Sequence, residues 1–271
     1  MGSKVRFVQD RDPLSVKAGT ATRLRLLPGL KVADGFTRHP FDEQFGVRTS
    51  GLVAGRHLKS GHPHDRHTTA YYGVAPSVFQ ELLRRWQRSR PAAPVEATTF
   101  IDIGAGMGRA VLLAAQNPFR QVVGVELNPT LVRIAKKNLA KWRIAGRAQP
   151  PMKIVCGDAV EFPLPAGPCL VFMFNPFGAP VMRRLLKAWS TDPHEHARQL
   201  DLIYVNNEQE HVLERELGRR PGSARLFLGQ IRRSRVDAIA DHRILANQPE
   251  GEYASSNVED CSIWRRAGIR G

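Results

Sequence analysis

The chain of 271 residues has little cysteine and no long hydrophobic run. Three cysteines are too few for a disulfide scaffold or for a zinc site made of cysteine alone. Cys156 and Cys169 stand in apolar, strand-like runs, where we expect buried and reduced thiols. No stretch approaches the ~18 apolar residues that a membrane span needs, and the N-terminal segment lacks the apolar core of a signal peptide. We therefore expect a cytoplasmic protein without a membrane partner.

Negative charge is also scarce, because 40 Lys and Arg residues face 25 Asp and Glu residues and give a net charge of +15. A basic protein attracts polyanions, so a nucleic-acid partner stays open. The basic residues are spread along the chain rather than gathered in blocks, which weakens that interpretation. The hydrophobic fraction of 42% is enough for a folded core.

The chain divides into two parts of different character. Residues 1–70 show little periodicity and carry clusters of Gly, Pro, Arg and His, which predicts an irregular N-terminal cap. Residues 71–271 form the predicted main domain. It opens with a helix, for which Ser77 and Gln80 supply a capping-box pattern.

Strand and helix signals then alternate. We expect strands over 98–103, 121–127, 152–156, 169–174 and 202–206, and helices over 109–116, 128–146, 181–189 and 208–217. Asn128 is the expected cap of the second of these helices, with Pro129 at its first position. Two last strands are expected at 224–228 and 261–265, joined by a polar loop. Such alternation predicts an α/β fold with a doubly wound, mostly parallel sheet, in which ligands bind at the carboxyl ends of the strands.

The first of these strand ends carries a glycine-rich turn, Asp102-Ile103-Gly104-Ala105-Gly106-Met107-Gly108. Its spacing does not fit the G-x-G-x-x-G pattern of dinucleotide-binding folds, because Arg109 stands where the third glycine would be. The second strand ends at Glu126 and Leu127, and a carboxylate at this position can accept hydrogen bonds from both ribose hydroxyls.

The pattern D-x-G-x-G-x-G resembles the first motif of class I S-adenosylmethionine-dependent methyltransferases. The resemblance implies S-adenosylmethionine as cofactor and a seven-stranded Rossmann-like sheet that ends in an antiparallel strand pair. It also implies that Asp158 accepts from the adenine amino group and that the next N–H, at Ala159, reaches the ring. The cofactor residues expected on this basis are Asp102, Gly104, Ala105, Gly106, Gly108, Glu126, Leu127, Asp158, Ala159 and Asn175.

The fourth strand ends in Asn175-Pro176-Phe177, which resembles the [D/N]-P-P-[Y/F] motif of methyltransferases that act on nitrogen, with one proline in place of two. Methyl transfer needs a nitrogen lone pair aimed at the methyl carbon. The side chain and carbonyl of Asn175 can accept the N–H bonds that orient this lone pair, and Phe177 can stack on a base or line an amine channel.

Upstream, Tyr71 and Tyr72 stand in a segment similar to one in seven-strand protein-lysine methyltransferases, where it helps form the acceptor channel. We therefore expect Asn175, Pro176, Phe177, Tyr71 and Tyr72 to serve catalysis, with Asp42–Gly46 as a further lid candidate. The acceptor expected from this resemblance is a protein lysine or another amine. The alternatives are a nucleic-acid base and, as a second alternative, a binding protein without catalysis.

Three histidines, His62, His64 and His67, form the pattern H-x-H-x-x-H. Imidazoles suit zinc or nickel, but the surrounding chain is rich in Gly, Pro and Asp and no cysteine is close. This composition predicts a solvated loop, and we expect no metal site.

Overall fold

The computed structural model describes four stretches of the chain, namely residues 38–147, 150–191, 199–246 and 256–266. The first 37 residues of the predicted cap lie outside the described residues. Within the four stretches, no helix is both long and apolar enough to cross a membrane.

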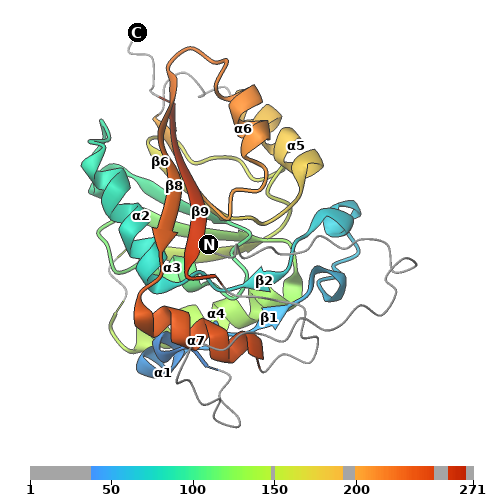
Figure 1. Cartoon of the computed structure of the whole chain (residues 1–271), viewed down its shortest axis with the longest axis vertical. Helices are drawn as coiled ribbons and strands as arrows, with labels where there is room; N and C mark the ends of the chain where they lie inside the picture. Colours follow the sequence, from blue (N-terminus) through green and yellow to red (C-terminus); the bar gives the residue numbers. More distant parts are fainter. Residues whose placement is uncertain (1–37, 148–149, 192–198, 247–255, 267–271) are drawn as a thin grey trace.

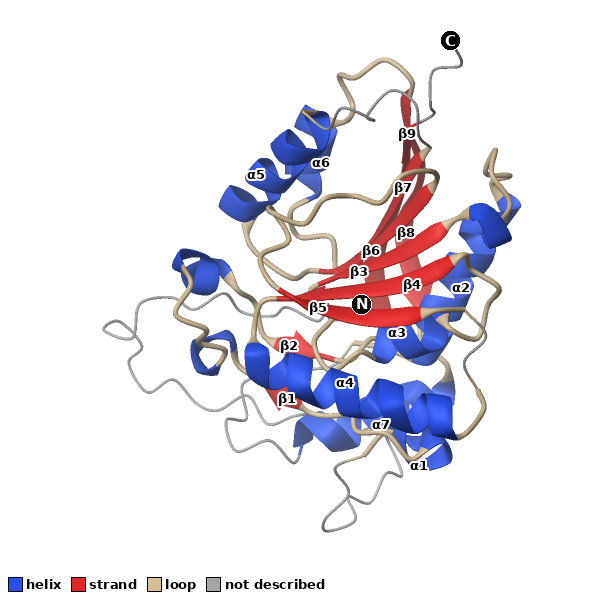
Figure 2. Ribbon diagram, turned by 180° about the vertical axis from the view of Figure 1, so that it is seen from behind, coloured by secondary structure: helices blue, strands red, loops and turns tan. Residues whose placement is uncertain are grey.

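A seven-stranded sheet forms the centre of the fold (Figure 2). In sheet order its strands are β5 (Met152–Cys156), β4 (Gln121–Glu126), β3 (Thr99–Ile103), β6 (Cys169–Phe174), β7 (Leu200–Val205), β9 (Val258–Arg266) and β8 (Ser223–Arg232). The first five run parallel, and β9 is antiparallel to both β7 and β8. The predicted doubly wound sheet with a C-terminal antiparallel pair is confirmed.

Helices cover both faces of the sheet (Figure 2). On one face lie α2 (Pro76–Arg88), α3 (Arg109–Ala114) and α4 (Pro129–Ile144), and on the other lie α5 (Ala179–Ser190) and α6 (Glu210–Glu216). Side chains alternate between the faces along each strand, so that Phe100 packs with the first layer and Ile101 with the second. Parallel neighbours need such crossover helices, which explains the alternation seen in the sequence.

The helix after β4 begins as predicted. The Asn128 side chain accepts hydrogen bonds from the backbone N–H groups of Thr130 (2.9 Å) and Leu131 (3.2 Å), and Pro129 occupies the first helical position. This N-cap fixes the chain direction directly after the strand end that carries Glu126.

The predicted capping box at the start of α2 is wrong. The helix begins at Pro76, two residues earlier than an N-cap at Ser77 would place it, and its N-cap residue Ala75 has no capping side chain. The backbone N–H of Ser77 instead donates to Asp237 Oδ2 at 2.7 Å. Because this cap comes from a distant helix, the local pattern around Ser77 could not reveal it.

The polar loop predicted between the last two strands contains a helix, α7 (Arg235–Ala246). It lies beside α1 (Pro40–Phe45) in Figure 1. Its buried face includes Asp237, Asp241 and His242, so polar residues occupy positions that an amphipathic pattern would give to apolar ones. These buried polar residues interrupt the apolar periodicity from which a helix would be predicted.

The buried state predicted for Cys156 is also wrong. Cys169 and Cys261 are buried and free, but Cys156 is exposed. It is the last residue of β5, which is the edge strand of the sheet.

The described part of the N-terminal region crosses the carboxyl edge of the sheet. After α1 it contains β1 (Leu52–Val53), the short 3₁₀ helices η1 (Gly55–His57) and η2 (Pro63–His67), and β2 (Tyr71–Tyr72). The strands β1 and β2 pair with each other in antiparallel fashion. A third 3₁₀ helix, η3 (Val95–Ala97), precedes β3.

Candidate active site

A pocket of about 720 Å³, its open mouth included, lies at the carboxyl ends of β4, β5 and β6. Nine of the predicted site residues line it: Tyr71, Tyr72, Gly104, Glu126, Leu127, Asp158, Ala159, Pro176 and Phe177. The parallel strands bring these residues together, as their positions at successive strand ends predict. Asp102, Ala105, Gly106, Gly108 and Asn175 do not contribute to the pocket wall.

The glycine turn after β3 requires glycine at two positions where other groups approach closely. Gly104 has φ +76°, and a Cβ there would lie 2.5 Å from the Cβ of Pro176. Gly106 has φ +54°, and the ring of Tyr71 lies where its Cβ would be. The turn is therefore packed between the upstream aromatic segment and the segment after β6, and a larger residue would separate them.

Glu126 is buried and fixes the turn from the neighbouring strand. Its Oε2 accepts from the backbone N–H of Gly106, and its Oε1 accepts from that of Asn128, both at 2.8 Å. Burial raises the pKa of Glu126, while these backbone donors oppose the rise. The carboxylate has about four lone-pair sites, so those that the backbone does not occupy can accept from a further hydroxyl group.

Asp102 lies near Glu126 but outside the pocket wall. Its side chain is buried, and burial together with the charge of Glu126 raises its pKa to about 8. A buried carboxyl of this kind is a proton-bearing group near neutral pH.

Asp158 follows β5 and lines the pocket with Leu127 and Ala159. Its Oδ1 accepts from the Val160 backbone N–H at 3.1 Å. Its Oδ2 lies 3.0 Å from His64 Nδ1, and the sequence does not predict this contact.

Asn175 is a predicted site residue that lies outside the pocket wall. It is buried, has φ +39°, and its Oδ1 accepts from the hydroxyl of Tyr204 at 3.2 Å. Its backbone carbonyl accepts from the Thr69 hydroxyl, and the Thr69 N–H donates to Pro176 O at 3.3 Å. The side chain thus faces β7, while the carbonyl faces the upstream segment.

The two upstream tyrosines both line the pocket. The Tyr71 hydroxyl donates to Thr49 O at 2.7 Å, and burial raises its pKa well above the ordinary value. Tyr72 packs with Ile244 and Leu245 of α7, and burial raises its pKa as well. Both phenols therefore stay neutral and form walls rather than bases.

Arg109, the first residue of α3, is a buried residue that sequence reasoning missed. It donates to Thr49 Oγ1 (2.7 Å), to Ser50 Oγ (3.0 Å) and to Gly73 O (3.2 Å). Asp42, predicted as a lid residue, lies outside the pocket wall and is buried, accepting from the backbone of Thr49 at 2.6 Å. Arg109 and Asp42 together fasten the N-terminal region to the glycine turn.

The solvated loop predicted for the histidines is wrong for His64. This residue is buried, lines the pocket and belongs to η2, whereas His62 and His67 are partly exposed. The sequence could not show this, because the covering groups come from Asp158 and from α5.

The pocket fits S-adenosylmethionine in the chemistry of its donor and acceptor groups. Glu126 offers two carboxylate oxygens for a ribose diol, and Asp158 offers a carboxylate for the adenine amino group. Leu127, Leu131 and Val181 supply apolar walls for the flat base.

The comparisons with known proteins agree with this fold. Residues 100–191 match the family model described as a methyltransferase domain. Comparison with curated protein sequences gave no match. Among solved structures, similar chains include a candidate RNA methyltransferase of Pyrococcus horikoshii (17% identity, 69% of this chain and 80% of the other, TM-score 0.46).

Two further structures of this kind are precorrin-6y C5,15-methyltransferase of Geobacter metallireducens and a candidate methyltransferase of Escherichia coli. Each is 15% identical and covers 70% of this chain and 87% of its own, with TM-scores of 0.46 and 0.45. Similarities at this level say nothing about the acceptor.

The family match over residues 100–191, the strand order and the pocket agree with a methyltransferase domain of the class I, Rossmann-like fold. S-adenosylmethionine is the methyl donor that this similarity implies.

Proposed function

We propose that this methyltransferase transfers the methyl group to a nitrogen atom, and that the acceptor enters beside Pro176 and Phe177. S-adenosylmethionine supplies an electrophilic methyl group when bound. The observation that carries the proposal is the segment after β6, in which Pro176 and Phe177 line the pocket and the Asn175 carbonyl accepts from the hydroxyl of Thr69, which also lines it.

The Asn175 carbonyl is the group that we assign to the acceptor nitrogen. In the structure it accepts from the Thr69 hydroxyl, so an acceptor N–H would replace this hydroxyl. The backbone of Asn175 is held in place by the bond from Tyr204 to its side chain. A fixed carbonyl can orient the nitrogen lone pair without any strong base.

An uncharged amine is the acceptor that the walls favour, with a protein lysine as the expected case. Among the described lining residues the carboxylates are Glu126 and Asp158, and both are assigned to the cofactor. Transfer of an ammonium ion into such a pocket would be opposed by desolvation. The amine therefore has to lose its proton before it reaches the aromatic walls.

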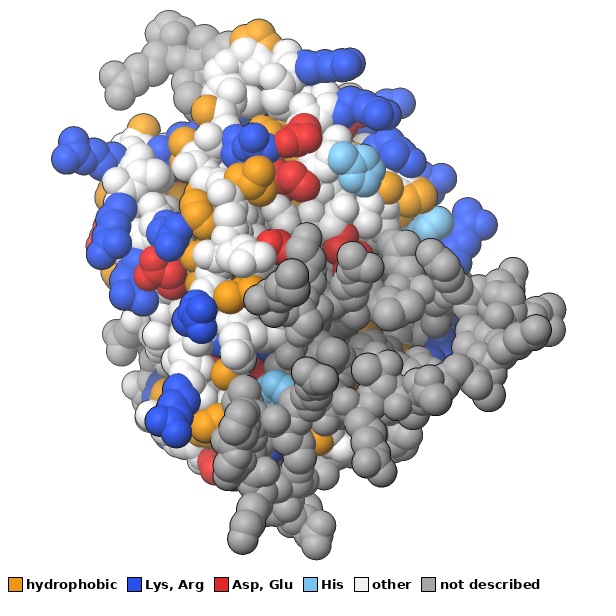
Figure 3. Space-filling model, in the orientation of Figure 1, with side chains coloured by type: hydrophobic (Ala, Val, Ile, Leu, Met, Phe, Trp, Pro, Cys, Tyr) orange, Lys and Arg blue, Asp and Glu red, His pale blue; other side chains and the backbone are white. Residues whose placement is uncertain are grey.

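A nucleic-acid base is the second candidate, and the net charge of +15 is the observation in its favour. In Figure 3 the Lys and Arg side chains are spread over the visible face, over both α2 and α5, rather than gathered in one patch. Phosphate contacts would need some of these side chains to act together.

The test uses S-adenosylmethionine with a tritium-labelled methyl group and a cell extract as the source of acceptors. The label would support a protein amine as the acceptor if protease digestion releases it and nuclease digestion does not. Nuclease-sensitive label would establish the second candidate. No transfer by a protein that still binds the cofactor would contradict the proposal and favour a binding protein without catalysis.

A further inference from the structure

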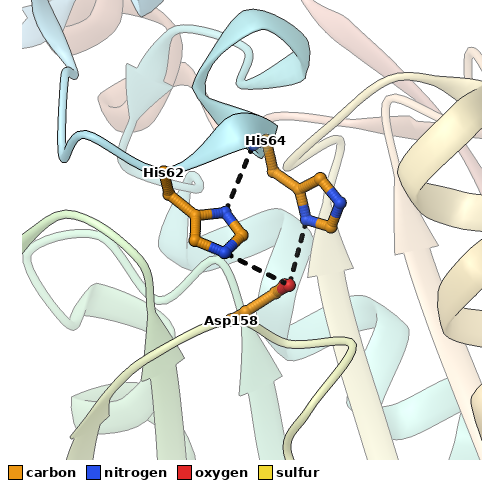
Figure 4. A group of neighbouring side chains, drawn as sticks. All are labelled: His62, His64 and Asp158. Atoms are coloured by element: carbon orange, nitrogen blue, oxygen red, sulfur yellow. Dashed lines mark hydrogen bonds and ion pairs between the residues drawn. The ribbon is translucent and has the colours of Figure 1, made fainter.

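Residues 62–72, here called the lid segment, contact both ends of the pocket. At one end His64 and His62 lie against Asp158 (Figure 4). At the other end the Gly178 N–H donates to His67 O at 3.0 Å, and Thr69 bonds the Asn175 carbonyl. One short stretch of chain thus connects the group assigned to adenine with the group assigned to the acceptor.

The hydrogen bonds of His64 define which of its nitrogens carries the proton. An Nη1 atom of Arg184 lies 2.8 Å from His64 Nε2, and a guanidinium can only donate. His64 Nε2 therefore accepts, and the proton of the neutral ring sits on Nδ1. That nitrogen lies 3.0 Å from Asp158 Oδ2.

His62 presents its ring to the same carboxylate in a similar way. Its Nδ1 accepts from the His64 backbone N–H at 3.2 Å, so its proton sits on Nε2. This nitrogen lies 3.9 Å from Asp158 Oδ2. The two rings and Asp158 have the composition of a metal site. A metal would bind the ring nitrogens nearest Asp158 through free lone pairs, but the hydrogen bonds above place a proton on each of these nitrogens.

We propose that His64 is a positioning residue that fixes the Asp158 carboxylate for recognition of the adenine amino group. The Val160 N–H donates to Oδ1 and the His64 ring lies against Oδ2, so these two neighbours restrict rotation of the carboxylate and favour one direction for its remaining lone pairs. Arg184 on α5 holds the ring from its other side. This inference rests on the assignment of Asp158 to adenine.

The same contacts make the lid segment sensitive to the cofactor. His64 is buried, and its two side-chain partners come from the β5 end and from α5. A base that bonds Asp158 therefore also stabilises the arrangement in which η2 closes the pocket. Loss of the His64 ring should reduce the preference for adenine more than it affects the remainder of the cofactor site.

The test compares S-adenosylhomocysteine with S-inosylhomocysteine, in which a carbonyl oxygen replaces the 6-amino group. Calorimetry on the full chain should show that the wild type prefers the adenosyl compound by about 10-fold or more, since hydrogen bonds to charged groups have this size. His64→Phe keeps a ring of similar size and should reduce the preference at least several-fold. His64→Asn keeps a donor near Nδ1 and should retain more of it.

The control is His211→Ala, which removes an exposed histidine of α6 and should leave the preference unchanged. Thermal melting of each variant separates misfolding from altered recognition. If folded His64→Phe keeps the wild-type preference for the adenosyl compound while Asp158→Asn lowers it, the inference is overturned. If Asp158→Asn also has no effect, the adenine assignment itself fails. Stoichiometric Zn²⁺ binding that is lost on replacing His62 or His64 would overturn the inference in favour of a metal site.

Discussion

Two buried carboxyl groups, Asp102 and Glu126, stand at the ends of the adjacent strands β3 and β4. Glu126 is compensated by two backbone N–H groups, whereas Asp102 is perturbed by burial and by the charge of Glu126. The two groups therefore differ: backbone donors oppose the rise in the pKa of Glu126, whereas Asp102 carries a proton up to about pH 8.

The raised pKa of Asp102 predicts a pH dependence of stability. Between its unfolded pKa near 3.8 and its folded pKa of about 8, the folded protein holds a proton that the unfolded chain lacks. The free energy of unfolding should therefore fall as pH rises through this window, by at most about 1.4 kcal/mol per pH unit from this group. Asp102→Asn should remove this contribution.

Denaturant unfolding of the cofactor-free protein from pH 5 to pH 9 checks this expectation. The stability of Asp102→Asn relative to the wild type should rise with pH and level off above about pH 8. Glu161→Gln, which changes an exposed carboxylate, serves as the control. A difference that does not vary with pH would show that Asp102 is not perturbed in the folded state.

Asn175→Gly tests the acceptor side without adding backbone strain. Asn175 has φ +39°, which glycine adopts freely, and the substitution removes the side chain that Tyr204 holds. The carbonyl would lose its fixed direction, so kcat should fall by about 10- to 100-fold while the KM for S-adenosylmethionine changes little. Steady-state kinetics on an identified acceptor gives both values. A variant that raises only the KM for the cofactor would move Asn175 from the acceptor to the cofactor.

Residues at strand ends could be predicted from sequence because each follows its own strand directly. Glu126 and Asp158 lie in the pocket for this reason. His64, Arg109 and Asp237 could not be predicted, because their roles arise from partners far along the chain. Nothing in the sequence near each of them specifies those partners.

At the scale of elements, the upstream region and the central sheet are joined by buried polar contacts. Arg109 at the start of α3 bonds Thr49, Ser50 and Gly73, and Asn138 of α4 donates to Arg48 O (2.7 Å) and Met107 O (2.9 Å). The glycine turn is thus tied to the region that precedes it.

Arg109→Met keeps much of the side-chain volume and removes these donors. Buried acceptors that include the carbonyl of Gly73 would be left unpaired, so the protein should lose about 3 kcal/mol of stability. Hydrogen exchange should rise over residues 42–50 before the sheet itself exchanges. The control is Arg120→Met on the surface. Unchanged exchange over residues 42–50 would show that Arg109 does not fasten this region.

Helix α7 shows what element prediction can miss. The strands and α4 were predicted because their apolar periodicity and the Asn128 cap are local signals. The buried face of α7 is partly polar: Asp241 lies 3.3 Å from Arg233, and Asp237 caps α2. Charged residues that interrupt the buried face in this way weaken the apolar stripe from which a helix is predicted.

At the scale of the molecule, the groups assigned to the cofactor and to the acceptor nitrogen follow strands of one sheet and lie at one edge of it. The strand order β5-β4-β3-β6-β7 brings four strand ends together, although they are spread along the chain. Ligands of such sheets bind at the carboxyl ends of the strands, so the general position of the site was predictable. The contact of His64 with Asp158 was not.

The central claim is that this edge binds S-adenosylmethionine through Glu126, and calorimetric titration with S-adenosylhomocysteine tests it most directly. The account predicts one site per chain in the wild type and in the exposed control Glu161→Gln. In Glu126→Gln the affinity should fall by about 10-fold or more, because charge-assisted hydrogen bonds are lost and the Gly106 contact is disturbed. No heat from the wild type, or equal affinity in Glu126→Gln, would contradict the account.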